Sequence, residues 1–329
     1  MSTEFVRKWG IGFTIALGVF LFVVYPMIGD EFTVIILTQC VIWGILASSL
    51  NLMLGYTGLA SLGHAAYFGS GAYAAAIMSV HYQSTFLEAL AVSLLVSVIV
   101  TAVFALVALR ATGVYFLMIT FALAMLVWGL AYRWDSMTGG ENGIAGITRP
   151  DFLTNTLTFH YFALLIGVGV FLFFISLVRS SFGKTLVGIR ESESRMQTLG
   201  YNVWLHKYII YLISGFFSGL AGFLWVFYNS YVAPTDVELL TSFNALLMVS
   251  LGGPGTLIGP VLGSAIFVFL DNTVNMYTER SLTVIGIVYI TVVLFAPKGV
   301  VGLIRQLIEA KMKKTEGLGE EEGKNISEA

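Results

Sequence analysis

The sequence has little charge and almost no cysteine. Charged residues occupy 11% of its 329 positions, and the net charge is −2. Without an excess of positive charge, the composition gives no sign of a nucleic-acid partner. The single cysteine, Cys40, lies in an apolar run and cannot form a disulfide within the chain. The composition therefore excludes a domain held together by internal disulfides.

Apolar residues take the place of the missing charge. Hydrophobic residues make up 57% of the chain, and the 35 glycines are not counted in that figure. With glycine this class reaches about two-thirds, whereas soluble domains have about 45–50%. The composition predicts an integral membrane protein. We expect an all-α, polytopic membrane helix bundle of about ten membrane segments, several of them short or broken by Gly or Pro.

The apolar runs can be compared with the length of about 20 residues that a membrane-spanning helix needs. Seven runs reach or approach it: 10–29, 33–54, 86–109, 113–132, 159–178, 208–228 and 281–297. Glycine interrupts three more: 56–80, 241–253 and 255–272. No small-residue cleavage site follows 10–29, so we interpret it as a retained first helix. This predicts one membrane domain, 1–309, and a charged, disordered tail, 310–329.

Lysine and arginine are distributed unevenly between the two sides predicted for the membrane. A cytoplasmic N-terminus and ten crossings would place 14 of the 17 Lys and Arg residues inside the cell, leaving Arg133, Arg149 and Arg280 outside. The charged segment 179–207 and both termini would then be cytoplasmic. A re-entrant segment would move the tail outside, and the basic tail argues against that.

Ionisable residues are scarce in the centres of the predicted spans. Only His64 lies within a broken segment, and no carboxylate lies at mid-depth. Ion-coupled transporters normally need such groups, so a stand-alone secondary transporter is disfavoured. ATP binding by this chain is also disfavoured, because Val178 replaces the first glycine that a P-loop at 183–185 would need. Four scattered histidines and no acid-rich motif argue against a membrane-embedded enzyme or a metal site.

Segment 179–207 contains a short amphipathic pattern. Leu186, Ile189, Met196 and Leu199 fall on one face of a helix that should end at Gly200. Glu191 and Arg195 would form an i,i+4 pair on it. A helix lying on lipid headgroups is usually rich in cations, whereas this polar face is mixed. The pattern slightly favours docking into a protein groove over lying on the membrane surface.

Three glycine-rich stretches interrupt the apolar sequence, at 51–76, 137–144 and 250–265. Broken helix at membrane depth is tolerated only inside protein or beside a water-filled path. Stretch 51–76 therefore either packs closely against a partner helix or lines a pathway, and His64 could bind a solute or a neighbouring carbonyl. Stretch 137–144 predicts a turn, which could also serve as a gate or as a contact for an external protein.

These stretches, together with 190–225 and 295–303, resemble the permease subunits of the branched-chain (hydrophobic) amino-acid ABC importers, LivM type, over about residues 40–305. The resemblance implies no enzymatic activity and no cofactor in this chain. It implies a related second permease forming a heterodimer, two cytoplasmic ATPases that bind ATP and Mg²⁺, and a periplasmic substrate-binding protein. It also implies a bacterial inner membrane. Related permeases carry urea, short amides or aromatic acids, so the substrate stays open.

The resemblance also implies roles for particular residues. The coupling motif of importer permeases matches Arg190, Glu191, Glu193 and Gly200, whereas Arg195 and Met196 stand where the family usually has alanines. The residues expected to contact the ATPases are Arg190, Glu191, Glu193, Arg195, Met196, Leu199 and Gly200. Those expected along the translocation pathway are Gly58, Ser61, Gly63, His64, Thr138, Gly139, Gly140 and Glu141.

Overall fold

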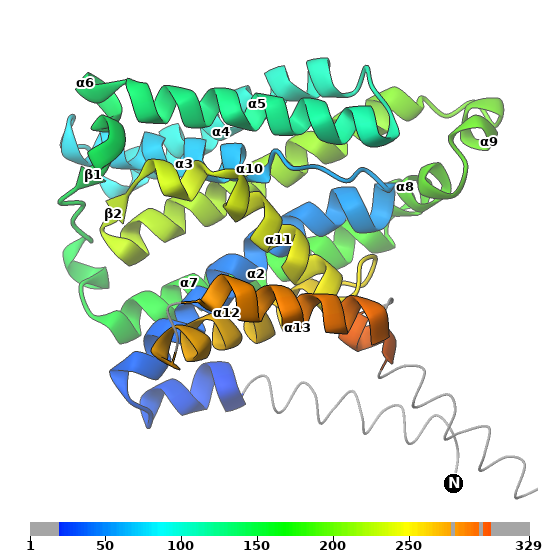
Figure 1. Ribbon diagram of the computed structural model, residues 1–329. Coiled ribbons are helices and arrows are strands. Elements are labelled where there is room, and N and C mark those ends of the chain that lie inside the picture. The colour runs from blue at the N-terminus through cyan, green and yellow to red at the C-terminus, as the bar shows by residue number, and fades with distance from the viewer. Residues whose placement is uncertain (1–19, 278–279, 296–298, 304–329) are drawn as a thin grey trace, which may run out of the picture.

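Helices account for most of the protein in the computed structural model, which describes residues 20–277, 280–295 and 299–303 (Figure 1). The α-helices are α2 Glu31–Thr57, α3 His64–Val80, α4 Phe86–Ala108, α5 Gly113–Arg133, α6 Asp135–Thr138, α7 Thr156–Arg179, α8 Ser181–Glu191, α9 Glu193–Thr198, α10 Val203–Asn229, α11 Leu239–Gly252, α12 Gly259–Tyr277 and α13 Ser281–Phe295. Shorter helical turns are η1 Phe20–Val24, η2 Tyr25–Met27, η3 Gly140–Asn142, η4 Asp151–Leu153 and η5 Pro234–Val237. Strands β1 Ile144–Ala145 and β2 Tyr231–Val232 pair antiparallel, with Ile144 opposite Val232.

This architecture confirms the predicted all-α membrane bundle. Within the described residues, five helices are long and apolar enough to cross a membrane, namely α2, α4, α5, α7 and α10, and α11 is a shorter apolar helix. The figure of about ten segments remains a prediction. Half of the expected first helix, 10–29, and the whole tail, 310–329, lie outside the described residues.

Several helices begin at polar residues that cap them. Thr85 and Glu88 form a capping box at α4, in which the Glu88 carboxylate accepts from the backbone N–H of Thr85 at 2.9 Å. The side chains of Asn155, Ser180 and Asn202 accept from backbone N–H groups in the first turns of α7, α8 and α10. Local sequence therefore fixes where these helices start, whereas their packing depends on burial.

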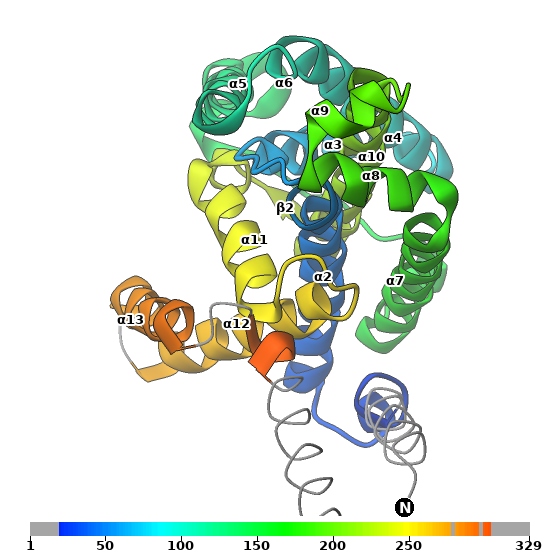
Figure 2. The same ribbon diagram turned by 90° about the vertical axis from the view of Figure 1, so that its right-hand side faces the viewer.

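Helices α2 and α10 form the centre of the bundle. In both, 72% of the most apolar 18 residues are buried, whereas the share is 28% in α4, 22% in α5 and 17% in α7. Figure 2 looks along the bundle and shows α2 and α10 surrounded by the other helices, with α5, α7 and α13 at the outside. The outer helices keep apolar faces free for lipid or for another subunit.

Glycines bring α3 and α10 into backbone contact. A Cβ atom added at Gly71 would lie 2.5 Å from the carbonyl oxygen of Gly219, and one added at Gly222 would lie 1.9 Å from that of Phe68. Such approaches are possible only without a side chain, as in other closely packed membrane helices. The Ser97 hydroxyl, from α4, donates to the Gly215 carbonyl at 2.9 Å and joins a third helix to this contact.

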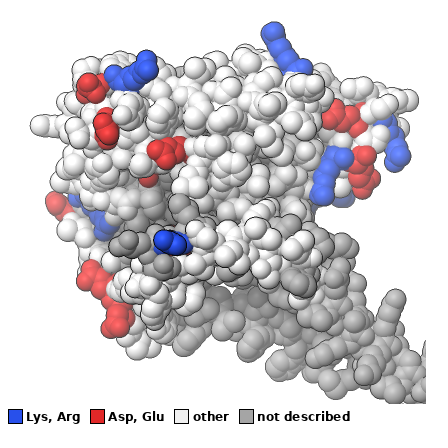
Figure 3. All heavy atoms as spheres, viewed as in Figure 1, with Lys and Arg blue, Asp and Glu red and all other residues white. Residues whose placement is uncertain are grey.

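The two ends of the bundle differ in charge. Helices α8 and α9, the loop between α4 and α5, and the loop between α11 and α12 lie at one end, which we call the α8–α9 end; β1, β2, α6 and η5 lie at the other, the β1–β2 end (Figure 1). Arg110, Arg179, Lys184, Arg190, Arg195 and Lys207 belong to the segments of the α8–α9 end. Figure 3 shows both signs at the opposite end with acids in the majority: the segments there carry Asp30, Glu31, Glu88, Asp135, Glu141, Asp151, Asp236 and Glu238, beside Arg133, Arg149 and Arg280.

Candidate functional site

Helices α8 and α9 protrude from the bundle as a paired unit (Figure 1). The single helix predicted from Leu186 to Leu199 is wrong, because the chain leaves the helical conformation at Ser192, with φ −163° and ψ 104°. The Ser192 hydroxyl then caps α9 by accepting from the N–H of Arg195 at 3.3 Å. Glu191 and Arg195 consequently lie on different helices, so their predicted i,i+4 pairing is also wrong.

Contacts within this unit fix α9 against α8 and α10. Ile189, Met196 and Val203 form a small buried cluster, one residue from each helix or its start. Glu193 forms an ion pair with Lys207, which is buried. Leu199, predicted to share the packed face, is 66% exposed, so that part of the prediction is wrong. An exposed leucine beside mixed charges leaves a surface suited to contact with another protein.

The end of α9 follows the prediction at Gly200. Its φ is +86°, the N–H of Gly200 donates to the Gln197 carbonyl at 2.9 Å, and the N–H of Tyr201 donates to the Met196 carbonyl at 3.1 Å. These two bonds define a Schellman motif, which requires a left-handed residue. A Cβ atom at Gly200 would meet nothing within 4 Å, so the backbone conformation alone accounts for glycine here.

Between α2 and α3 the chain breaks as predicted. Residues 58–63 are not helical, Gly58 has φ +75°, and α3 begins at His64. Side chains from other helices satisfy the freed backbone groups: Leu62 N–H donates to the Thr120 hydroxyl at 3.1 Å, and the Ser242 hydroxyl donates to the Leu62 carbonyl at 2.8 Å. The break is therefore an ordered element held between α5 and α11.

His64 is fully buried at the start of α3, and its tautomer follows from its partners. The Ser214 hydroxyl donates to the Ser49 carbonyl at 2.6 Å, so it accepts from Nε2–H of His64 at 2.8 Å. Nδ1 is then an acceptor, and no residue in the described part of the chain donates to it. One nitrogen thus holds α3 to α10 and α2, while the other retains an unused lone pair at the break.

Replacing His64 with alanine is expected to destabilise the purified protein by about 1–3 kcal/mol, because it removes a buried hydrogen bond and leaves Ser214 without its donor. Thermal unfolding in detergent measures the effect. His81→Ala serves as the control, since His81 is exposed at the end of α3 and should melt as the wild type does. Equal unfolding temperatures for both variants would contradict a stabilising contribution from the His64–Ser214 hydrogen bond.

The glycine-rich loop at the β1–β2 end forms the predicted turn. Gly139 and Gly140 have φ of +72° and +56°, and the buried Thr138 hydroxyl donates to the carbonyls of Ala131 at 2.8 Å and Trp134 at 2.7 Å. Glu141 is exposed. Of the predicted pathway residues, Gly58, Ser61, Gly63 and His64 come together at the break, whereas those of 138–141 lie at the bundle end; their role in transport remains a prediction.

A second ordered loop lies beside this turn and was not expected. The Asp236 carboxylate in η5 accepts from the Trp225 indole at 2.9 Å and from the N–H of Ala233 at 3.0 Å. Burial raises the pKa of the Asp236 carboxyl above its usual value, although both donors favour the charged form. Tyr231 joins the two loops, because its hydroxyl donates to the Asn142 carbonyl at 2.9 Å.

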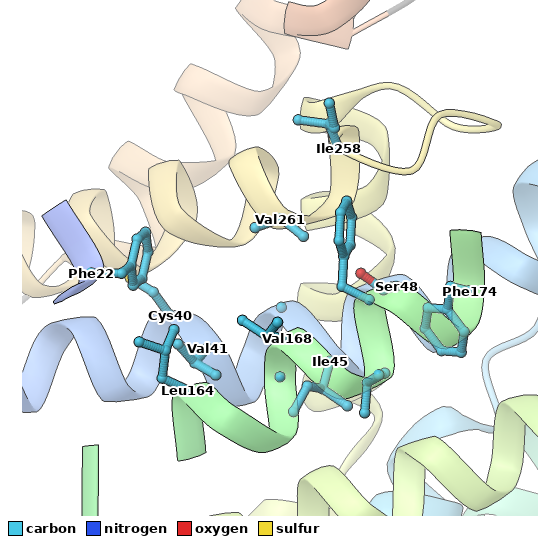
Figure 4. A pocket seen from close by; sticks show the side chains of 14 residues that line it. Phe22, Cys40, Val41, Ile45, Ser48, Leu164, Val168, Phe174, Ile258 and Val261 are labelled. Carbon is cyan, nitrogen blue, oxygen red and sulfur yellow. The ribbon is translucent and has the colours of Figure 1, made fainter. Parts of the chain in front are cut away.

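An apolar pocket of about 220 Å³ lies between α2, α7 and α12 (Figure 4). Its lining includes Phe22, Cys40, Leu164 and Val261, and the hydroxyl of Ser48 has no partner in the described part of the chain. A zwitterionic amino acid would lose its hydration here and find a single hydroxyl in exchange. None of the predicted pathway residues lines this pocket, so the pocket is not part of the predicted pathway.

Comparison with known proteins places the chain in a family. The model of the family "Branched-chain amino acid transport system / permease component" matches residues 32–296. The chain belongs to this family. As a permease component it is a membrane transport protein, in agreement with the resemblance that its motifs showed.

Relatives of this permease support the assignment over most of its length. It is 27% identical to the high-affinity branched-chain amino acid transport system permease protein LivM of Salmonella typhimurium over 90% of this chain and 76% of that protein. It is 26% identical to LivM of Escherichia coli over the same shares. A probable LivH permease of Methanocaldococcus jannaschii is 25% identical over 59% of this chain and 66% of that protein. No solved structure matches.

Sequence analysis missed the residues that hold the break. Thr120, Ser214 and Ser242 are hydroxyl residues within apolar helices, and their partners lie 58 to 180 positions away in the chain. The available signal was that each is a polar side chain in a predicted span, where an unpaired hydroxyl is costly. That signal identifies a residue needing a partner without naming the partner.

Proposed function

We propose that this permease is one of two membrane subunits of an ABC importer that moves branched-chain or other hydrophobic amino acids into the cell. The observation that carries the proposal is the α8–α9 unit, which protrudes from the bundle with exposed charges and an exposed leucine on an internally braced scaffold. Because its helices are held to one another, such a protrusion can transmit the movement of another protein to the bundle without changing its own shape. Alternating access driven by two cytoplasmic ATPases, which would bind ATP and Mg²⁺, accounts for such a device.

Charge supports the orientation that this mechanism needs. The described segments of the α8–α9 end carry six cations and two acids, whereas acids predominate at the β1–β2 end. Since positive loops face the cytoplasm, α8 and α9 would meet the ATPases inside the cell, and both termini would be cytoplasmic. The β1–β2 end would face outward, toward a periplasmic substrate-binding protein. A bacterial inner membrane fits this arrangement.

The energy source follows from what the membrane region contains. Within the described spans two histidines are fully buried: His64 at the break, held by Ser214, and His160 in α7, which hydrogen-bonds to Thr38 and to the Phe22 carbonyl. A buried histidine without a carboxylate partner is a poor coupling site for an ion gradient, and neither His64 nor His160 has such a partner among the described residues. ATP hydrolysis on separate subunits therefore serves better as the source of work, and this chain contributes no catalytic group.

The substrate proposal rests on the relatives, whose names specify branched-chain amino acids. The match to a LivH permease in addition to LivM supports a related second permease as the partner. The Gly58–His64 break, with its surrounding hydroxyls and the free Nδ1 of His64, is the proposed part of the translocation pathway in this chain. Transport of urea, short amides or aromatic acids would leave this mechanism unchanged.

Purification of the tagged permease from its native host in mild detergent tests the assembly. Mass spectrometry is expected to identify a second permease and an ATPase pair. The complex, reconstituted with ATP inside vesicles and the binding protein outside, should then accumulate labelled leucine. Recovery of a homogeneous single chain that transports without ATP would establish the secondary transporter instead. ATP-dependent uptake of urea but not leucine would correct the substrate alone.

A further inference from the structure

Arg190 occupies an unusual place for a residue of a protruding segment. Its side chain reaches from α8 to the C-terminal end of α2, where Nη1 donates to the Gly55 carbonyl. That carbonyl lacks its helical partner, because the N–H of Leu59 donates instead to the Met53 carbonyl at 2.9 Å. A cation at a helix C-terminus also complements the helix dipole. Arg190 thus completes the end of α2 three residues before the break begins at Gly58.

The same carbonyl lies against the second break, 253–258. A Cβ atom at Gly55 would lie 2.3 Å from the nitrogen of Gly255, and Asn51 fastens the two segments together. Its Oδ1 accepts from the N–H of Gly255 at 2.9 Å, and its Nδ2 donates to the Thr256 carbonyl at 2.8 Å. The end of α2 and the turn before α12 therefore form one hydrogen-bonded unit.

Arg190 lies between the two breaks, although the residue as a whole is exposed. A Cβ atom at Gly58 would lie 3.3 Å from Arg190 Cγ, and one at Gly255 would lie 3.0 Å from Arg190 Nη1. Both glycines have left-handed backbones, with φ of +75° and +79°. Each break therefore approaches this side chain at a residue without a side chain of its own. The guanidinium would have to move with either segment or lose its contact.

We propose that Arg190 is a positioning residue that transmits movement of the α8–α9 unit to both breaks, 58–63 and 253–258. This inference rests on the proposed function and adds a second role for Arg190, which the sequence-based expectation assigned to contact with the ATPase. Its guanidinium donates to the end of α2 and lies beside Gly255 in the turn before α12. Displacement of α8 pulls on the end of α2, and through Asn51 the same displacement reaches the turn that starts α12. The ATPase-driven step thus reorients the pathway segment beside His64.

The test uses the complete reconstituted importer and compares Arg190→Gln with the wild type. Assembly with the ATPases should persist, whereas leucine transported per ATP hydrolysed should fall at least tenfold, because the link between α8 and α2 is lost. Arg190→Lys keeps the charge and should restore part of this ratio. Lys184→Gln removes an exposed cation from the same helix and should leave the ratio unchanged.

A double variant separates transmission from a local structural defect. Asn51→Ala should lower the ratio on its own, and Arg190→Gln combined with it should cause little further loss, since both act on the Gly55–Gly255 unit. If Arg190→Gln no longer assembles with the ATPases, Arg190 serves docking and not transmission, and the inference is wrong. A wild-type ratio of leucine transported to ATP hydrolysed in Arg190→Gln would also overturn it. In either case ATP-dependent leucine uptake by the wild-type complex keeps the proposed function intact, whereas its absence from the wild type would remove the proposed function itself.

Discussion

Gly222→Val is expected to prevent the bundle from folding. The new Cβ would lie 1.9 Å from the carbonyl oxygen of Phe68 and 2.8 Å from its carbonyl carbon, both in the backbone of α3. A backbone atom cannot rotate away as a side chain does, so α3 and α10 would have to separate. Because α10 is one of the two most buried long helices, separation exposes much of the core. Overpacking usually costs about 1–3 kcal/mol, and this contact offers less relief than most.

Size-exclusion chromatography of a fluorescently tagged protein in detergent measures the result. Gly222→Val should give aggregate and almost no monodisperse peak. Gly129→Val in α5 and Gly169→Val in α7 make the same change in helices at the outside of the bundle, where the added Cβ meets nothing within 4 Å. Both controls should elute as the wild type does. A normal peak for Gly222→Val would contradict the α3–α10 contact.

Local signals explain what the sequence could predict about this fold. The break before His64 and the end of α9 at Gly200 both depend on glycine, which allows left-handed backbone that other residues disfavour. The apolar runs likewise predicted the long helices to within a few residues, because a span must satisfy its backbone internally. Such features need no knowledge of distant partners.

Contacts between distant segments explain which features of the fold the sequence could not predict. The residue that ends α8 is Ser192, whose capping role competes with a continuous helical pattern that local spacing favours. Arg190 bonds to Gly55 across 135 positions, and Ser242 bonds to Leu62 across 180. An arginine on an amphipathic segment looks the same in the sequence whether it faces an ATPase or its own bundle, so only the packing of α8 against α2 decides.

Reversing the charge of Glu193 while replacing Gly200 with valine is expected to abolish leucine uptake by the reconstituted importer. Glu193→Lys sets two cations side by side at Lys207 and removes the ion pair that holds α9 to α10. Gly200→Val forces a β-branched residue into φ +86° and disrupts the end of α9. The surface that would meet the ATPase loses its shape, while the membrane helices keep their packing. Uptake and the amount of protein in the membrane are measured in parallel.

Matched variants show whether shape at this surface is the cause. Glu193→Lys combined with Lys207→Glu restores the pair with its charges exchanged and should regain part of the uptake. Gly200→Asn tolerates the left-handed conformation and should be close to wild type. Gly113→Val introduces the same backbone strain at φ +59°, also in open space and at the same end, but outside α8 and α9. Normal uptake in the Glu193→Lys, Gly200→Val variant would remove the α8–α9 unit from the coupling mechanism, and loss in Gly113→Val alone would point to strain anywhere at this end.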